Sequence, residues 1–485
     1  MEVAVASSPA PFIDPESTST SKPTVANRKR KLASLGTSPA PSDGLADQQG
    51  NVLVSTDRAV IDERPRLSIS RHPTFVPIPN SGDPCLNTTE GHAINRKLDN
   101  VAYRYVPAGL TEVGSALPCR TIESAPTHVR VSWEDRSPFI KVSQDGLTLG
   151  GEKGFRSARC NVPVQEGKWY MEVKILKGGG DGKVDNSMAD GAHVRLGWGR
   201  REAPLNGPIG MDGYSYGYRD KTGEKVTLSR TKAYGQPFGT GDMIGIYISL
   251  PPRRQPDPHD PYDPAQVKRE RIAIEFKGQE YFEILDYKPS QEMIDLTKVQ
   301  VKAKGAAPPN NPRESPKKPA AGKTTPSAAR APKKVKPQNI SRPLPTLGSE
   351  SFIAFFVNGK CQGIAYQDLY DYLQLRQTPA QIAEKQKSVR HREHGPRQHA
   401  ENPFDDGSLG YYPFISLYGD ARVRLNPGPH FEFTPPNDID RACLTSDTLS
   451  PQEADSKERT WRPLQDRYQE FMQQQWELDV IEEAD

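Results

Sequence analysis

Alternation of large apolar and polar residues marks short strands in the middle of the chain. Residues 169–175 read Trp-Tyr-Met-Glu-Val-Lys-Ile, and residues 194–198 read Val-Arg-Leu-Gly-Trp. A period of two is typical of a β-strand with one buried face. In the second segment this pattern directs Val194, Leu196 and Trp198 toward the core and Arg195 toward the opposite face.

Further short strands are predicted before and after these two. The segments rich in β-branched and aromatic residues are 129–131, 139–142, 147–149, 242–248, 271–276, 352–357, 361–365, 412–418 and 422–425. Asp145-Gly146 and Asn358-Gly359 are dipeptides typical of tight hairpin turns between strands. Because helical periodicity is almost absent between these segments, we expect an all-β fold, an antiparallel β-sandwich.

Composition limits how much of the chain that sandwich can include. Of 485 residues, 34% are hydrophobic and 46 are proline. Such a chain cannot bury enough apolar surface to offset the entropy of ordering along its whole length. We therefore predict one domain broken by disordered stretches: a disordered N-terminal region (1–94), the domain in two parts (95–298 and 347–435), a basic Lys/Pro/Ala-rich insertion (299–346), a polar insertion (376–408), a linker (436–460) and a C-terminal helix (461–485).

The C-terminal segment carries the one clear helical stripe. At 100° per residue, one side of the helix gathers Leu464, Tyr468, Phe471, Met472 and Trp476. Such a helix either packs on its own domain or fills a groove on a partner, and we favour the partner. On this interpretation, deletion of 461–485 leaves the sandwich intact.

Charge and cysteine content bear on location. Lys and Arg number 64 against 61 Asp and Glu, so the net charge of +3 conceals local clusters. The cluster Arg28, Lys29, Arg30 and Lys31 suits a nuclear import receptor, with a solvated charge run as the alternative. Five cysteines without a CxxC pair indicate reduced thiols inside a cell, and no apolar run is long enough to predict a membrane span.

No catalytic constellation emerges from the sequence. Residues 178–183 are glycine-rich, but no Ser or Thr follows Lys183, as a phosphate-binding loop requires. We expect no catalytic residue, no metal and no cofactor. Arg195 and Arg219 are more informative, because a strand and an aromatic-rich stretch would hold their guanidinium groups rigidly. Such a pair suits carboxylate or phosphate through bidentate hydrogen bonds.

Several segments together carry a family pattern. They read GEKGF, EGKWYMEVKI, RLGWG, PIGMDGYSYGYRD, YGQPFGTGDMIGIYI, FFVNGKCQGIAY and YYPFISLYGDARVRLNPGP. Over about 98–432, outside the insertions, the chain resembles the SPRY (B30.2-like) domain of the Ash-two/Bre-two family. The resemblance implies a nuclear, non-catalytic scaffold and activator of a COMPASS (Set-one type) complex, in which a SET-domain methyltransferase modifies lysine 4 of histone H3.

The resemblance also implies partners and the residues that bind them. The family's pocket for an acidic segment of a WD-repeat propeller subunit corresponds to Phe155, Arg195, Pro208, Met211 and Arg219, with Phe155 and Met211 where animal relatives carry tyrosines. The C-terminal stripe would dock on a DPY-thirty-like (Sdc-one) dimer. Weak nucleic-acid or nucleosome contact would come from the basic insertion. The alternative is a SPRY adaptor of another assembly, such as a ubiquitin ligase or an RNA-associated complex.

Overall fold

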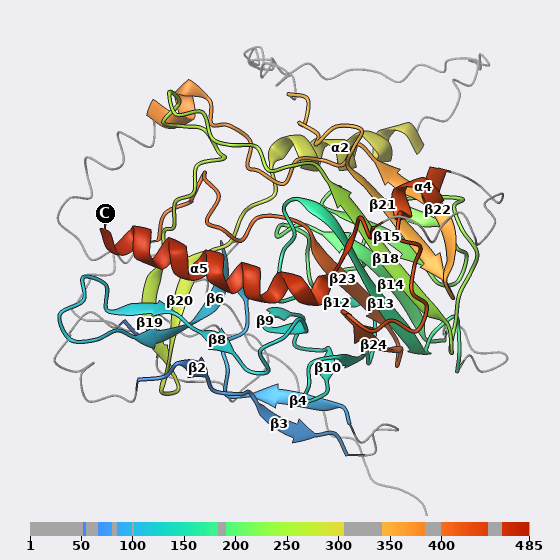
Figure 1. The fold of residues 1–485 in the computed structure, drawn as a ribbon, viewed down its shortest axis with the longest axis horizontal. Helices are drawn as coiled ribbons and strands as arrows, with labels where there is room; N and C mark the ends of the chain where they lie inside the picture. The colour runs from blue at the N-terminus through green and yellow to red at the C-terminus, as the bar shows by residue number, and fades with distance from the viewer. Residues whose placement is uncertain are drawn as a thin grey trace, which may run out of the picture. The chain divides into compact units, whose positions relative to one another are not determined.

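Short β-strands make up most of the regular structure (Figure 1). The computed structural model describes residues 52–54, 66–79, 85–98, 101–182, 191–304, 342–383, 399–444 and 458–484. In this part of the chain the strands form sheets of ten, seven, six and two strands. Nearly all neighbouring strands are antiparallel, as the sequence predicts.

The ten-stranded sheet forms one layer of a sandwich. Its strands, in spatial order, are β22 (Lys360–Gln367), β21 (Phe352–Val357), β18 (Met243–Leu250), β13 (Gly167–Lys177), β24 (Arg422–Asn426), β11 (Thr148–Gly150), β10 (Lys141–Val142), β4 (Asn87–Glu90) and β3 (Thr74–Pro77), while β25 (Arg462–Pro463) pairs in parallel with β13.

The seven-stranded sheet forms the other layer. In spatial order it contains β17 (Arg230–Lys232), β16 (Lys225–Thr227), β15 (Ser215–Arg219), β14 (His193–Gly199), β23 (Tyr412–Tyr418), β12 (Arg156–Cys160) and β9 (Val131–Arg136). Its inward residues, among them Leu196 and Trp198, share one core with Met171 and Val173 of β13. This shared core confirms the predicted antiparallel β-sandwich.

A six-stranded sheet lies beside the sandwich. Its strands are β1 (Val52–Val54), β19 (Ile272–Phe276), β20 (Gln279–Leu285), β6 (Val101–Leu110) and β5 (Arg96–Leu98), with β7 (Cys119–Thr121) on β6; a separate parallel pair joins β2 (Ile69–Ser70) to β8 (Glu123–Ser124). Small apolar clusters that include Ala108, Phe282 and Tyr281 stabilise this sheet. It is not evident from the sequence as a separate layer.

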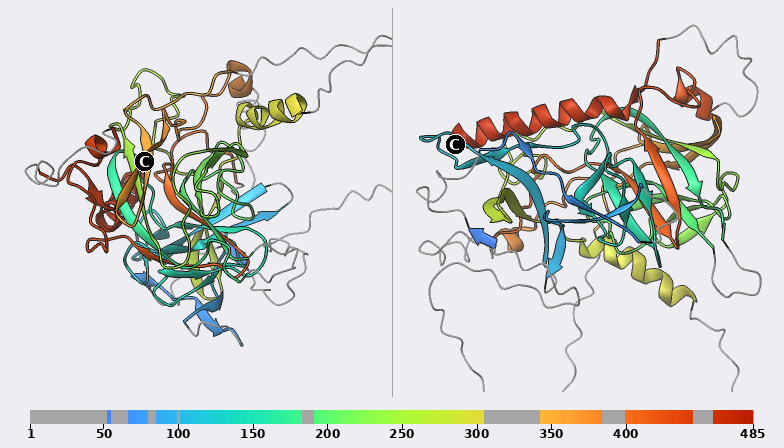
Figure 2. Two further views of the ribbon diagram at one scale, coloured as in Figure 1. Left: turned by 90° about the vertical axis from the view of Figure 1, so that its right-hand side faces the viewer. Right: turned by 90° about the horizontal axis from the view of Figure 1, so that it is seen from below.

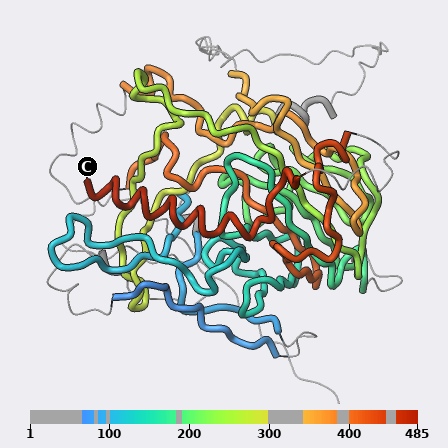
Figure 3. Tube along the Cα trace, in the orientation of Figure 1, coloured from blue at the N-terminus to red at the C-terminus, as the bar shows by residue number. Residues whose placement is uncertain are grey.

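Helices are few in the described residues: α2 (Gln291–Lys304), a short helical stretch at 379–383, α4 (Ile439–Leu444), the 3₁₀ turn η1 (Leu464–Asp466) and α5 (Arg467–Ala484). Figures 1 and 2 show α5 running from the sandwich toward β6, β19 and β20. The Cα trace in Figure 3 shows the same path of the chain's last segment. The predicted C-terminal helix is therefore present, and it lies against both the sandwich and the six-stranded sheet.

Both predicted hairpins are confirmed. Lys141 pairs with Gly150 around Asp145-Gly146, and Val357 pairs with Lys360 around Asn358-Gly359. Asn358 and Gly359 have φ of 49° and 79°, the left-handed conformation that this two-residue turn requires.

The prediction of one buried face for residues 169–175 is wrong. Met171 and Val173 face the sandwich core, but Tyr170 and Glu172 on the other side of β13 are also buried. Phe431 and Trp461 cover Tyr170, with ring centroids at 5.0 and 5.4 Å. The C-terminal part of the chain folds back over this face, which a local pattern cannot reveal.

Several predicted boundaries also change. Order begins before residue 95, because β3 pairs with β4 and Leu86 is buried. The helix α2 extends into the predicted 299–346 insertion, the buried Asp405 lies in the predicted 376–408 insertion, and α4 lies in the predicted 436–460 linker. The import cluster at 28–31 and most of the basic insertion lie outside the described residues, so nuclear import and nucleic-acid contact through them stay predictions.

Candidate binding site at the arginine pair

Arg195 and Arg219 lie directly opposite each other on β14 and β15. Side chains of opposed residues in an antiparallel pair share one face of the sheet. The next pair along, Leu196 and Tyr218, is fully buried in the sandwich core, so the two arginines point outward. Both arginine side chains are half-buried. The prediction that Arg195 occupies the outward phase of its strand is confirmed.

The loop that follows β14 covers part of this outer face. Ile209 N donates to Ser416 Oγ at 2.9 Å, and Ser157 Oγ donates to Gly207 O at 2.6 Å. Gly217 makes room for the loop, since a Cβ there would lie 2.6 Å from Ile209 Cγ2. Two outward serines and one glycine therefore place the loop residues Pro208 and Met211 beside the arginine pair.

Arg195 is held in place by an aromatic ring and a carbonyl. Its Cζ lies 4.4 Å from the centre of the Phe155 ring, and its Nη1 donates to Ile209 O at 3.3 Å. Burial and the nearby Arg219 lower the pKa of Arg195 to about 10, so it is charged at neutral pH. Among the residues that the structure describes, Arg195 forms no ion pair with a carboxylate. Its guanidinium is therefore oriented by Phe155 and the Ile209 carbonyl, and the nearby Asp220 carboxylate offsets part of its charge without a direct ion pair.

Arg219 has a carboxylate partner. Its Nη1 lies 2.7 Å from Glu224 Oε2, and the two side chains are 25% and 30% exposed. Thr222 Oγ1 donates to the same Glu224 oxygen at 2.7 Å. The ion pair is thus open to solvent, and a ligand carboxylate can reach Arg219 alongside Glu224 or in its place.

Four of the five residues predicted for this pocket lie together, and Met211 belongs to the same loop as Pro208. Phe155 stacks on Arg195, Arg219 lies across from it, and Pro208 and Met211 flank the carbonyl that orients it. The sequence did not single out Ile209, Ser416, Tyr418 or Glu224, which complete the surroundings. Alternation along β23 directs Ser416 and Tyr418 to the outer face and is a signal that could have found them.

The predicted docking stripe on the C-terminal helix has a mixed placement. Leu464, Tyr468 and Met472 are buried in the sandwich core, and Phe471 packs against it. Trp476, in contrast, is 38% exposed. The outward apolar surface of α5 continues through two residues that were not predicted, Val480 and Ile481. The stripe thus anchors the helix to its own domain through most of its members.

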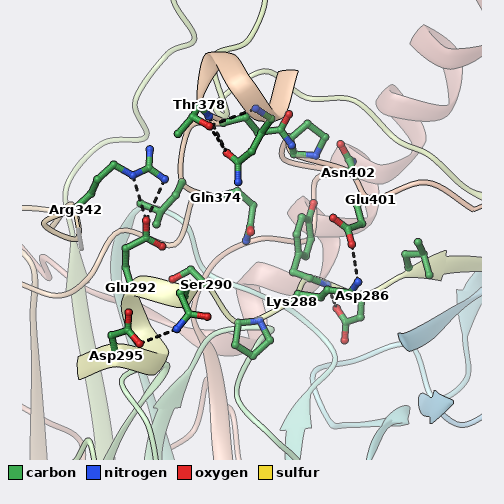
Figure 4. Close-up of a pocket in the computed structure, with 18 residues that line it drawn as sticks. Asp286, Lys288, Ser290, Glu292, Asp295, Arg342, Gln374, Thr378, Glu401 and Asn402 are labelled. Carbon is green, nitrogen blue, oxygen red and sulfur yellow. Dashed lines mark hydrogen bonds and ion pairs between the residues drawn. The ribbon is translucent and has the colours of Figure 1, made fainter. Parts of the chain in front are cut away.

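Figure 4 shows a separate hollow of about 620 Å³ between α2 and two loops. Ion pairs cross it between Lys288 and Glu401 at 2.5 Å and between Arg342 and Glu292 at 3.1 Å. Four carboxylates and two basic side chains line it, and two of those carboxylates are paired across it with the two basic side chains.

Two further findings concern the part of the chain that the structure describes. No group of three or more His, Cys, Asp or Glu side chains there is placed to hold a metal ion. No helix there has the length and apolar character that crossing a membrane takes.

Comparisons with known proteins identify the domain and its relatives. Residues 168–253 match the SPRY domain. The chain is 34% identical to "Set1 complex component ash2" of Schizosaccharomyces pombe over 86% of this chain and 50% of that protein. It is 31% identical to "COMPASS component cclA" of Colletotrichum higginsianum over 84% of this chain and 70% of that protein.

An animal relative matches over a shorter stretch. "Set1/Ash2 histone methyltransferase complex subunit ASH2" of Drosophila melanogaster is 28% identical over 64% of this chain and 37% of its own length. The chain thus spans between about a third and 70% of the length of these relatives. The sandwich, the arginine pair and these matches agree: the chain belongs to the SPRY-domain family of Set1/COMPASS components typified by ash2 and cclA.

Proposed function

We propose that this chain is a non-catalytic scaffold and activator subunit of a nuclear Set1/COMPASS complex that methylates lysine 4 of histone H3. Its relatives are named as components of such complexes. In this role the chain holds partner subunits so that the SET-domain enzyme takes its active arrangement. The observation that carries the proposal is the outward Arg195 beside Arg219, a charged site without a catalytic group.

The arginine pair binds an acidic segment of a WD-repeat propeller subunit. Two half-buried guanidinium groups can each donate paired hydrogen bonds to a carboxylate. Phe155 and Met211 add an apolar wall that strengthens these contacts by partly excluding water. Arg195 needs no internal carboxylate to be displaced before it binds.

Substitution of each arginine tests this assignment. Hydrogen bonds to charged groups contribute about 1.5–3 kcal/mol each, so Arg195→Ala and Arg219→Ala should each weaken binding of the propeller subunit by about 10- to 100-fold. Isothermal titration calorimetry on the purified full chain measures this loss. Arg424→Ala is the control, because Arg424 forms a more exposed ion pair with Asp145 at 3.1 Å on the other sheet. Unchanged binding by the double arginine variant would show that the pocket is wrongly assigned.

The outward side of α5 docks on a DPY-thirty-like dimer. Trp476, Val480 and Ile481 are exposed apolar side chains on this helix, which supports the proposal. Val480→Asp should abolish co-purification with the dimer, whereas Gln469→Asp on an exposed position of the same helix should not. Deletion of 461–485 is no longer a clean test, because it removes Trp461 and Leu464 from the core. Retention of the dimer by Val480→Asp would exclude this face.

A further inference from the structure

We infer that Glu224 sets the charge of the ligand that the arginine pair accepts. Glu224 opposes the doubly charged phosphate of a phosphorylated side chain more strongly than the singly charged carboxylate of an Asp or Glu side chain, and so shifts the preference of the site toward carboxylate. This inference rests on the proposed function of the same pocket and adds a chemical class of ligand to it.

The turn between β15 and β16 fixes Glu224 in front of Arg219. Arg219 N donates to Glu224 O, and Gly223 N donates to Arg219 O, both at 3.0 Å. Gly223 has a φ of +65°, and a Cβ there would lie 2.2 Å from Gly235 O, so the turn has little freedom to rearrange. Because Thr222 Oγ1 also donates to Glu224 Oε2, the carboxylate is held toward the guanidinium.

The charges at the site then make a second negative charge on the ligand less favourable. Arg195 and Arg219 contribute two positive charges, and Glu224 removes one, which leaves a net charge of +1. Asp220, the next carboxylate along the chain, is buried and accepts from the backbone N–H groups of Gly179 and Val194. Its negative charge acts on Arg195 and offsets a further part of the positive charge at the site. A second negative charge on the ligand would lie close to Glu224, which already opposes Arg219.

The wall residues point to the same ligand class. A phosphate group carries three acceptor oxygens, and a carboxylate carries two. Phe155 and Met211 have no hydroxyl group to donate to a third oxygen. The hydroxyl groups of Ser157 and Ser416 are engaged with each other at 2.6 Å and with the covering loop. The side chains of these four residues thus offer no donor to a third ligand oxygen.

Two peptides that differ in one side chain test the inference. One is an acidic peptide with a central Glu, and the other carries phosphoserine at that position. Binding to the full chain is measured by fluorescence anisotropy at fixed salt and at a pH well above about 6, where the phosphate holds its second charge. The readout is the ratio of the two dissociation constants, compared between the wild-type chain and Glu224→Gln.

Glu224→Gln should strengthen both complexes unequally. An exposed ion pair contributes about 0.2–1 kcal/mol, so removing the opposing carboxylate should tighten the Glu peptide by up to about fivefold. The doubly charged phosphopeptide should gain up to about the square of that factor, roughly 25-fold. Glu432→Gln is the matched control, since Glu432 forms a surface ion pair of the same length, 2.7 Å, with Lys174 on the other sheet.

Two different outcomes distinguish failure of this inference from failure of the proposed binding function of the pocket. If Glu224→Gln changes both peptides by the same factor, or changes neither, Glu224 does not select ligand charge and the inference is wrong. If Arg195→Ala binds the Glu peptide as tightly as the wild-type chain does, the proposed binding of acidic segments at the arginine pair is wrong, independently of the result for Glu224.

Discussion

The carboxylate of Asp479 ties the far half of α5 to the six-stranded sheet, and its removal should loosen that half. Asp479 accepts from Thr121 N at 2.7 Å and from Thr121 Oγ1 at 3.0 Å. The Nη2 atoms of Arg269 and Arg271 each donate to it at 2.8 Å. The variant Asp479→Ala removes all four hydrogen bonds at once.

The expected loss of stability follows from burial and from a second acid. The side chains of Arg269 and Arg271 are 5% and 3% exposed. Breaking a buried ion pair costs about 3–5 kcal/mol when the remaining charge has no other partner. Here Glu482 stays within 3.2 and 2.6 Å of the same two guanidinium groups. We therefore expect Asp479→Ala to lower the free energy of unfolding by about 2–3 kcal/mol, and the double variant with Glu482→Ala to lose more.

Urea unfolding gives the free energy, and hydrogen exchange of the backbone amides in α5 shows where protection is lost. Glu477→Ala is the control, because Glu477 is exposed on the same helix. Neutral surface substitutions change the free energy of unfolding by up to about 0.5 kcal/mol. If Asp479→Ala changes it by no more than that, Asp479 does not hold α5 on the six-stranded sheet.

Three further predictions concern other parts of the sandwich. Burial raises the pKa of Asp212 from 3.8 to about 6. The protonated carboxyl therefore favours folding, and this contribution to stability is lost as pH rises through 6. Asp212→Asn should flatten the fall in the free energy of unfolding between pH 4 and 7. The sulfur atoms of Cys361 and Cys443 lie 3.4 Å apart, so peroxide should join them with loss of two hydrogens in the intact mass, and Cys443→Ser should prevent this. At Gly197 a Cβ would lie 1.9 Å from Tyr216 O, so Gly197→Ala should cost at least the upper part of about 1–3 kcal/mol, measured by thermal unfolding.

Local pattern was sufficient for the sandwich and for the direction of Arg195. The alternation in 194–198 fixes which side chains face the core, because one face of the strand is apolar throughout. It could not give the register that sets Arg195 opposite Arg219, since the intervening loop decides that pairing. Nor could it show that Glu224 lies in front of Arg219. The sequence of a charged turn does not reveal whether a carboxylate in it forms an ion pair.

Long-range pairing explains most of what the sequence did not predict. The strand β6 contains Pro107 and Gly109, residues that weaken a strand pattern, and its partner β20 lies far along the chain. The C-terminal stripe shows a related limit. Its apolar period is the same for a helix that packs on its own domain and for one that fills a partner's groove, so burial of Tyr468 and Met472 could come only from the structure.

The position of β23 and β24 has a consequence for synthesis of the chain. The strand β23 fills the gap between β14 and β12, and β24 fills the gap between β13 and β11. Until residues 412–426 leave the ribosome, both layers therefore have an unfilled slot at their centre, with hydrogen-bonding edges exposed. Completion of this domain is consequently a late event, and a nascent chain released before that point would be a substrate for chaperones and a seed for aggregation.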